Sequence, residues 1–283
     1  MKTNALYFIL SLFIIVSCSS SDDDGNTPNE PIIGNYYPSV ANNTWIYNVE
    51  NLSIDDATLN STGVDLVEIN TSGNPFTIEV NSGNSSANGL MNAILNSGTL
   101  NRSGSTLGIN GTINLPEQLE IISNSSLNLS NFVLYDLNAN INQQLSEIND
   151  VLTDEINING SIIPINAIYS ITSTRRNNLN SLDVDGETFN DIISTEINVN
   201  ITITATIDIA GSSTTVTVVN AQDVLNITSF FAEDIGLIQS EATQSYTLDP
   251  AFLNLLQVVN ITLDFPTSLS VDNTQELDSF QVN

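Results

Sequence analysis

An alternation of apolar and polar residues runs from Ile193 to Ile209 and is the clearest pattern in the chain. Odd positions carry Ile, Val and Ala with a single Thr, and even positions carry Ser, Glu, Asn, Thr and Asp. A repeat of two is typical of a β-strand with one buried and one solvated face. Because strands usually span about 3–10 residues, the pattern predicts a strand that is long and curled or broken by a bulge.

Further segments rich in β-branched and aromatic residues predict more strands. These segments are 44–50, 76–81, 107–115, 119–122, 132–141, 156–163, 167–174, 214–219, 224–231 and 237–246. Asp249-Pro250 is a start signal for a helix over 251–258, and 90–95 is a second short helical segment. Segment 142–152 fits a short helix or a loop. Strands that follow strands through Gly, Asn and Ser turns predict an all-β, mainly antiparallel fold with one or two short helices.

A short apolar run, 5–16, follows Lys2 at the start of the chain. As a helix it would be roughly 18 Å long, which is shorter than a hydrocarbon core of about 30 Å. A charged start, a short apolar stretch and small residues are typical of a secretory signal. The alternative, a buried helix of the mature domain, is disfavoured because Ser, Cys and Asp follow at once.

The segment Ile15-Val16-Ser17-Cys18 resembles the lipoprotein box of bacteria, in which the Cys becomes the acylated first residue. A lone Cys beside a targeting segment fits a lipid anchor, and each buried methylene contributes about 0.8 kcal/mol to membrane binding. The alternative is a free, exposed thiol in an exported protein. We predict that residues 1–17 are a lipoprotein signal peptide and that acylated Cys18 holds the protein on a lipid bilayer.

The residues after Cys18 predict the membrane face to which the protein is exported. They resemble the tag with which Bacteroidota send lipoproteins to the outside of the outer membrane; its members are Ser19, Ser20, Ser21, Asp22, Asp23 and Asp24. Segment 19–31 has no apolar residue and predicts a solvated linker. We therefore expect residues 18–33 to be the lipidated Cys with a flexible acidic tether, and residues 34–283 to be a single antiparallel β domain.

The amino-acid composition excludes several kinds of catalytic and metal site in this domain. The chain has 32 Asp+Glu, 4 Lys+Arg, no His and one Cys, with a formal net charge of −28. Without His there is no Ser-His-Asp triad and no His-ligated zinc, and one Cys forms no internal disulfide. A surface this acidic repels nucleic acid. We predict no catalytic residue, no metal site and no cofactor; catalysis by two carboxylates stays open, although no spacing singles out a pair.

Two short motifs suggest binding chemistry. Segment 183–187 (DVDGE) offers the oxygen ligands that calcium prefers, but Ser181 and Ile192 stand at the ends of the EF-hand template, so a turn before a strand is favoured. Arg175 and Arg176 are adjacent cations in a chain with few. They fit a bidentate clamp for an anionic ligand or a solvated hairpin tip.

Aromatic residues in the predicted strands are candidates for lining a ligand pocket. Trp45 and Tyr47 share one face of segment 44–50. An open concave face would let them contact a glycan or a lipid. Aromatic side chains in strands more often belong to the core, so both interpretations stand.

Several patches resemble a family of uncharacterised surface lipoproteins of Bacteroidota, of the Flavobacteria type. The patches are Tyr36-Tyr37-Pro38 with Thr44-Trp45-Ile46-Tyr47, segment 230–241 (FFAEDIGLIQSE), segment 185–192 (DGETFNDI) and segment 274–280 (TQELDSF). The resemblance implies a single strongly curved antiparallel sheet, an open half-barrel like that of lipoprotein carrier proteins. It implies no known activity.

Two functions follow as expectations for a lipoprotein that is anchored in the bacterial outer membrane and faces the cell exterior. In the first, the curved sheet binds an apolar or amphipathic small molecule in a pocket of several hundred Å³. In the alternative, the domain is an adhesion or interaction module of a cell-surface complex, with a glycan or a protein as partner. That alternative predicts an exposed apolar or aromatic patch on the loops or on a sheet edge.

Overall fold

The computed structural model describes residues 34–83, 86–115, 126–158, 161–209, 212–258, 262–263 and 266–283. All of them belong to one of the two compact units of the chain, Ile32–Asn283. The predicted signal peptide, Cys18, the Ser19–Asp24 tag and the predicted strand 119–122 lie outside the described residues.

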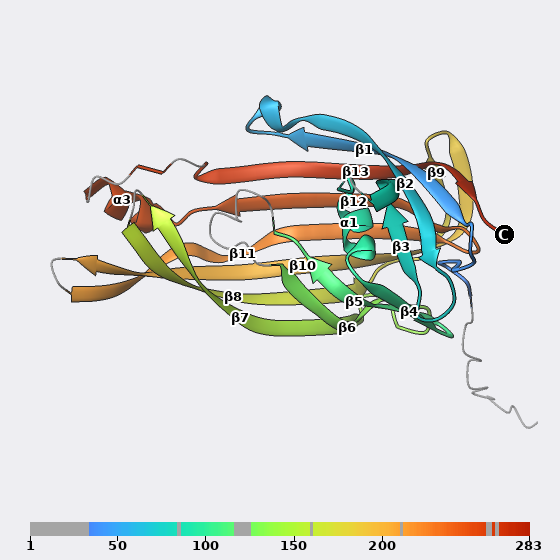
Figure 1. The fold of residues 1–283 in the computed structure, drawn as a ribbon, viewed down its shortest axis with the longest axis horizontal. Coiled ribbons are helices and arrows are strands. Elements are labelled where there is room, and N and C mark those ends of the chain that lie inside the picture. The colour runs from blue at the N-terminus through green and yellow to red at the C-terminus, as the bar shows by residue number, and fades with distance from the viewer. Residues whose placement is uncertain are drawn as a thin grey trace, which may run out of the picture. The chain divides into compact units, whose positions relative to one another are not determined.

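A ten-stranded antiparallel sheet dominates the fold (Figure 1). It contains β1 (Thr44–Ser53), β2 (Ser61–Thr71), β3 (Thr77–Val80), β7 (Gln144–Ile158), β8 (Ser161–Arg175), β9 (Leu179–Val184), β10 (Glu187–Ile209), β11 (Ser212–Ala232), β12 (Gly236–Thr247) and β13 (Ser268–Gln281). The order is β3-β2-β1-β13-β12-β11-β10-β8-β7, and β9 pairs with β10. The sheet is curved and does not close, so the predicted all-β, open half-barrel class is confirmed.

A second sheet, of three strands, covers part of the inner, concave face of the large sheet. It consists of β4 (Thr99–Ser103), β5 (Thr106–Ile113) and β6 (Leu127–Asp136). A single bridge between Phe76 and Leu100 joins it to the β3 side of the large sheet. At the other side, the Val133 N–H donates to Ser146 Oγ at 2.8 Å, and Ser173 Oγ donates to Val133 O at 2.6 Å. Reasoning from the sequence anticipated one sheet only.

The helices are few and short, as expected. Helix α1 (Leu90–Asn96) lies on the inner face, and α3 (Pro250–Val258) lies at one end of the long strands (Figure 1). Asp249 Oδ1 accepts the N–H groups of Ala251 at 2.7 Å and Phe252 at 3.1 Å. The start signal Asp249-Pro250 therefore works as an N-cap followed by Pro in the first turn. Short 3-10 turns, η1 (Ala57–Leu59) and η2 (Asn81–Gly83), complete the helical segments among the described residues.

The longest strand confirms the alternating pattern. β10 has 23 residues, and the side chains of Ile197, Val199 and Ile201 are buried on its inner face. Its pairing with β11 shifts register after Val199, after Ile201 and after Ile203. The strand is therefore both long and interrupted by irregularities, which bend it and increase its twist.

Several strands differ from the predictions. The predicted strand 132–141 overlaps β6 only over residues 132–136, because β6 begins at Leu127 and ends at Asp136. Segment 142–152, predicted as a short helix or a loop, lies mostly in β7. Its polar composition hides the strand pattern, and pairing with β8 makes it a strand. Segment 156–163 is not one strand but the ends of β7 and β8, with Ile158 facing Ser161 in the register. The predicted strands 214–219 and 224–231 are both parts of β11.

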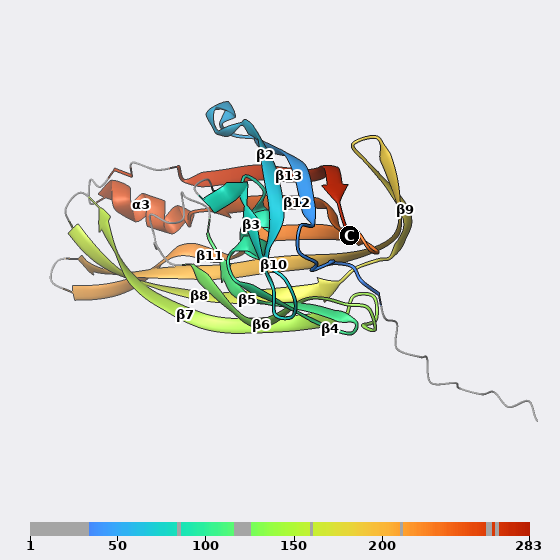
Figure 2. The same cartoon turned by 45° about the vertical axis from the view of Figure 1, so that its right-hand side comes forward.

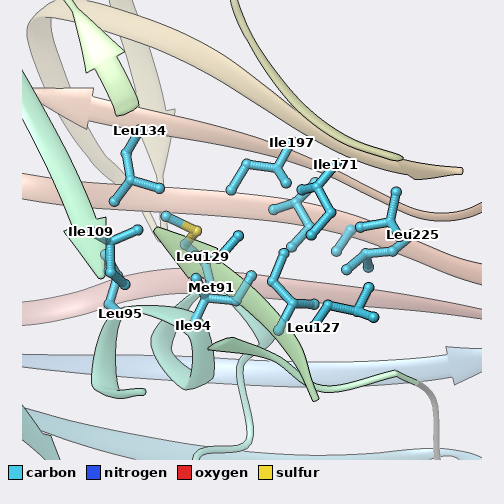
Figure 3. Packing of buried hydrophobic residues seen from close by; sticks show 14 of the residues in the cluster. Met91, Ile94, Leu95, Ile109, Leu127, Leu129, Leu134, Ile171, Ile197 and Leu225 are labelled. Atoms are coloured by element: carbon cyan, nitrogen blue, oxygen red, sulfur yellow. The ribbon is translucent and has the colours of Figure 1, made fainter. Parts of the chain in front are cut away.

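The core fills the space between the two sheets. Side chains from α1, β5 and β6 meet side chains of β8, β10 and β11 there; labelled in Figure 3 are Met91, Ile94, Leu95, Ile109, Leu127, Leu129, Leu134, Ile171, Ile197 and Leu225. Phe252 and Leu256 of α3 are buried in the same core. The concave face of the half-barrel is thus packed with the protein's own side chains where α1, α3 and the small sheet cover it.

The long strands give the described unit two distinct ends. At one end, the Asp234 N–H in the β11–β12 turn donates to Asn35 O at 2.7 Å, so the described chain enters there. The β9–β10 hairpin curls at that end (Figure 2), and Asn48 Nδ2 donates to Asp185 Oδ2 near its tip at 3.3 Å. The end of β7, the start of β8, the end of β10 and the start of β11 lie at the opposite end (Figure 1). We call the latter the distal end.

Candidate binding surfaces

The inner face offers little room for a ligand where its lining is described. A cavity of about 40 Å³ lies between α1 and the small sheet, next to Leu225. Its walls include Ile94 and Ile113. Ligand pockets are usually about 300–1,000 Å³ in volume, so this cavity is too small for a lipid or a drug-sized molecule.

Trp45 and Tyr47 belong to the core. Both side chains are almost fully buried. Trp45 Nε1 donates to Ile235 O at 2.7 Å, and Tyr47 Oη donates to Leu237 O at 2.8 Å. Their polar atoms are therefore occupied by the β11–β12 turn and β12, and the aromatic rings hold β1 against that region rather than lining an open pocket.

Arg175 and Arg176 point to opposite faces and do not form a shared clamp. The Arg176 guanidinium binds Glu196 Oε1 at 2.6 Å and Asn142 Oδ1 at 2.9 Å on the outer face. Arg175 is only 3% exposed and donates to Asn178 Oδ1. Its Nη1 has no hydrogen-bond partner among the described residues, and burial lowers the pKa of its guanidinium.

A buried carboxylate that the sequence did not reveal organises the entry to α1. Asp65 is 0% exposed, and it accepts five hydrogen bonds of 2.8–3.1 Å, from Asn81, Asn88, Gly89 and Asn92. Burial alone raises the pKa of this carboxyl, but the hydrogen bonds outweigh burial and lower the pKa below its ordinary value. Asp65 is therefore an ionised anchor for the segment that begins α1.

The cluster around Asp65 extends to β13. Gln275 Nε2 donates to Asn92 Oδ1 at 3.0 Å, and Gln275 Oε1 accepts the N–H of Asn92 at 3.3 Å. Asn273 Oδ1 accepts the N–H of Leu90 at 3.1 Å. These bonds satisfy polar groups that burial would otherwise penalise, so the cluster is a structural one.

The calcium-like segment 183–187 forms the turn between β9 and β10. Asp185 and Gly186 both have positive φ, of 46° and 83°, as a tight hairpin turn requires. Thr188 Oγ1 donates to Asp183 Oδ1 at 2.5 Å. Among the residues that the structure describes, no group of three or more acidic or Cys side chains is placed to hold a metal ion.

The outer face of the large sheet carries two grooves, of mixed and of mainly polar lining. One, of about 520 Å³, lies over β2, β1 and β13 and is lined by Glu50, Thr62 and Glu276 among others. The other, of about 370 Å³, lies over β11, β12 and β13. Both include Thr274, so they adjoin one another. Hydroxyl, amide and carboxylate groups line the smaller groove, whereas Val49 and Val64 stand beside the polar residues of the larger one. Together the grooves suit a ligand that has both hydrogen-bonding groups and apolar faces.

Three exposed apolar side chains lie on the outer face of β7 and β8, between the middle of these strands and the distal end. Ile162 is 65% exposed, Ile168 54% and Val151 49%. Val151 faces Ile168 in the register, and Ile162 shares their face of the sheet because it is separated from Ile168 by an even number of residues. We call the outer face formed by Val151, Thr153, Glu155, Ile162, Pro164, Asn166 and Ile168 the distal face. A groove of about 470 Å³ lies on it.

Among the described residues, β7 pairs only with β8, which leaves its other edge without a partner strand. Two N–H groups on that free edge are occupied locally. Asp150 Oδ1 accepts the N–H of Val151, and Asp154 Oδ1 accepts the N–H of Glu155, both at 2.8 Å. Sequence reasoning missed this edge because it took the segment for a helix or a loop.

Comparison with other proteins adds no relative. No helix within the described ranges is long and apolar enough to cross a membrane. No protein-family model, curated protein or solved structure matches the chain.

Proposed function

We propose that the protein is a lipid-anchored, non-enzymatic interaction module on the outer surface of the bacterial outer membrane. Cys18 is its anchor, and the Ser19–Asp24 tag directs it outward. The domain holds a partner of the cell-surface complex through its distal face. The alternative of an apolar ligand inside the half-barrel is less favoured, because the described part of the inner face is packed.

The exposed apolar side chains on both sides of the groove on the distal face carry this proposal. Single exposed apolar residues are normal, but here the facing pair Val151 and Ile168 and the side chain of Ile162 lie on one sheet face with a groove between them. The location supports the same conclusion. Ile162 and Arg175 lie at opposite ends of β8, about 40 Å apart at 3.3 Å per residue, and the chain enters at the Arg175 end.

A glycan is the second candidate partner, and the two adjoining grooves on the outer face favour it, because a sugar ring has hydroxyl groups and apolar faces. Glu50, Thr62 and Thr274 offer acceptors and donors that match sugar hydroxyls. The carboxylates there would repel an acidic sugar, so the expected glycan is neutral.

Photo-crosslinking on intact cells tests the proposal. A photoreactive side chain replaces Ile162 on the distal face, and the matched control carries it in place of Ile54, an exposed isoleucine in the turn after β1. We expect a discrete protein adduct from position 162 and none of that size from position 54. The same adducts from both positions, or none from position 162, would contradict the proposal.

A further inference from the structure

We propose that the distal face binds a basic amphipathic helix of a partner protein, and that the partner does not add a strand to β7. This inference rests on the proposed function and specifies its partner. It follows from three features of the described residues: the blocked edge of β7, the spacing of the apolar side chains and the charge around them.

Strand addition along the edge of β7 is obstructed at two positions. An added strand would need the N–H groups that point away from β8. Asp150 and Asp154 already occupy the N–H groups of Val151 and Glu155. A strand docking there would meet two carboxylates in place of two donors, and this is how proteins protect exposed edges.

The apolar side chains lie at two positions along the face. Ile162 lies near the distal tip, and the facing pair Val151 and Ile168 lies about 20 Å away at 3.3 Å per residue. Asn166 and Thr153, which also face each other, lie between them. A helix of about four turns spans this distance. Because a helix satisfies its own backbone groups, it can lie on a face without a ladder of hydrogen bonds.

The negative charge of this surface favours a positively charged partner. Asp154 and Glu155 line the groove, and Glu147 and Asp150 lie on the same strand. The β7 and β8 segments contain no Lys or Arg before Arg175. A partner with Lys or Arg beside its apolar residues complements this surface, whereas a second copy of this chain would place carboxylates against carboxylates.

The test uses the full-length mature lipoprotein in an uncharged detergent and a Leu/Lys peptide with helical spacing. The controls are the same peptide with Glu in place of Lys, and a scrambled Leu/Lys peptide. We expect the Leu/Lys peptide to bind, the Glu version not to bind, and Ile162→Asp or Ile168→Asp to weaken binding about tenfold or more, a loss of about 1.4 kcal/mol. Ile54→Asp is the matched control and leaves binding unchanged. Binding weakens as salt concentration rises.

Hydrogen exchange separates docking on the face from strand addition. We expect the amides of Val151 and Glu155 to keep their exchange rates when the peptide binds. Slower exchange at these two amides would overturn the inference in favour of strand addition. Equal binding of the Glu peptide, or full binding by Ile162→Asp, would also overturn it. If the adduct from position 162 on cells persists in these cases, the proposed function survives and only the partner's chemistry is wrong.

Discussion

At the scale of single residues, Asp65 shows how a buried charge can be held without a counter-charge. None of its five hydrogen bonds comes from a cation. Two come from the backbone N–H groups of Asn88 and Gly89, just before α1. Charge-assisted hydrogen bonds are stronger than neutral ones, and together they keep the carboxylate ionised and fix the start of the helix that covers the inner face.

Replacing Asp65 by Asn should destabilise the fold strongly. One oxygen becomes an NH₂ group that faces N–H donors, so at least one buried donor loses its acceptor. We expect a loss of about 2–4 kcal/mol in the free energy of unfolding, measured by urea denaturation. Asp278→Asn, at an exposed position on β13, is the control. A loss below about 0.5 kcal/mol for Asp65→Asn, as for a surface substitution, would show that the cluster is not an anchor.

The same residue gives a pH prediction. The pKa of Asp65 is lower in the folded protein than its ordinary value of 3.8, so the unfolded state binds more protons and the stabilisation grows with pH. The stabilisation is complete well above pH 3.8 and is lost as the pH falls through that value toward the folded-state pKa. The stability difference between the native protein and Asp65→Asn should therefore shrink from pH 6 to pH 3. A difference that is constant with pH would contradict this assignment.

At the scale of elements, the edge of β7 is protected by its own aspartates. Replacing Asp150 and Asp154 by Ala should free two edge N–H groups and increase self-association through strand pairing. Light scattering and sedimentation of the double variant measure this. The control, Asp55→Ala with Asp278→Ala, removes the same charge elsewhere on the surface. Equal association of the two variants would mean that net charge, not the blocked edge, keeps the protein soluble.

Helix α3 offers a second test at this scale. Asp249→Ala removes the acceptor for the N–H groups of Ala251 and Phe252, so the helix should fray and its amides should exchange faster. Asp249→Asn keeps a side-chain acceptor that caps helices well and should restore slow exchange. Equally fast exchange in both variants would contradict the role of Asp249 as the cap.

Local sequence signals predicted the elements that depend on local rules. The alternation over Ile193–Ile209 gave most of β10, and Asp249-Pro250 gave the start of α3. The divergence of Arg175 and Arg176 also follows from strand geometry, because adjacent residues point to opposite faces. Most of β7 was not predicted, because polar residues such as Asp150 and Asp154 interrupt its alternation of apolar and polar residues. These two aspartates instead accept backbone N–H groups of the strand's free edge.

Features that depend on distant contacts could not be read from the sequence. Asp65 is buried because Tyr47 on β1 faces it across the sheet and Asn92 on α1 bonds to it. Neither neighbour is identifiable from the residues around Asp65. The position of the small sheet also depends on contacts between residues far apart in the sequence. These are the Phe76–Leu100 bridge and the hydrogen bonds of Ser146 and Ser173 to Val133.

At the scale of the whole molecule, the net charge of −28 and the packing of the described inner face decide which partners fit the protein. The acidic surface keeps the domain soluble and away from anionic headgroups. Where its residues are described, the inner face is packed with side chains, which favours binding on the outer surfaces over an internal ligand. We propose that a partner meets the domain at the distal face, which lies away from the end where the described chain enters.

Thiol labelling on intact cells is the most direct test of an outward-facing domain whose distal face is occupied. Because we propose that Cys18 is acylated, Ile162→Cys or Ile54→Cys introduces a single reactive thiol for a maleimide that cannot cross membranes. We predict that both variants react in the purified protein, and that on cells Ile54→Cys still reacts whereas Ile162→Cys is protected. Failure of Ile54→Cys to react on cells would contradict the outward orientation. Equal reaction of both positions on cells would contradict a partner at the distal face.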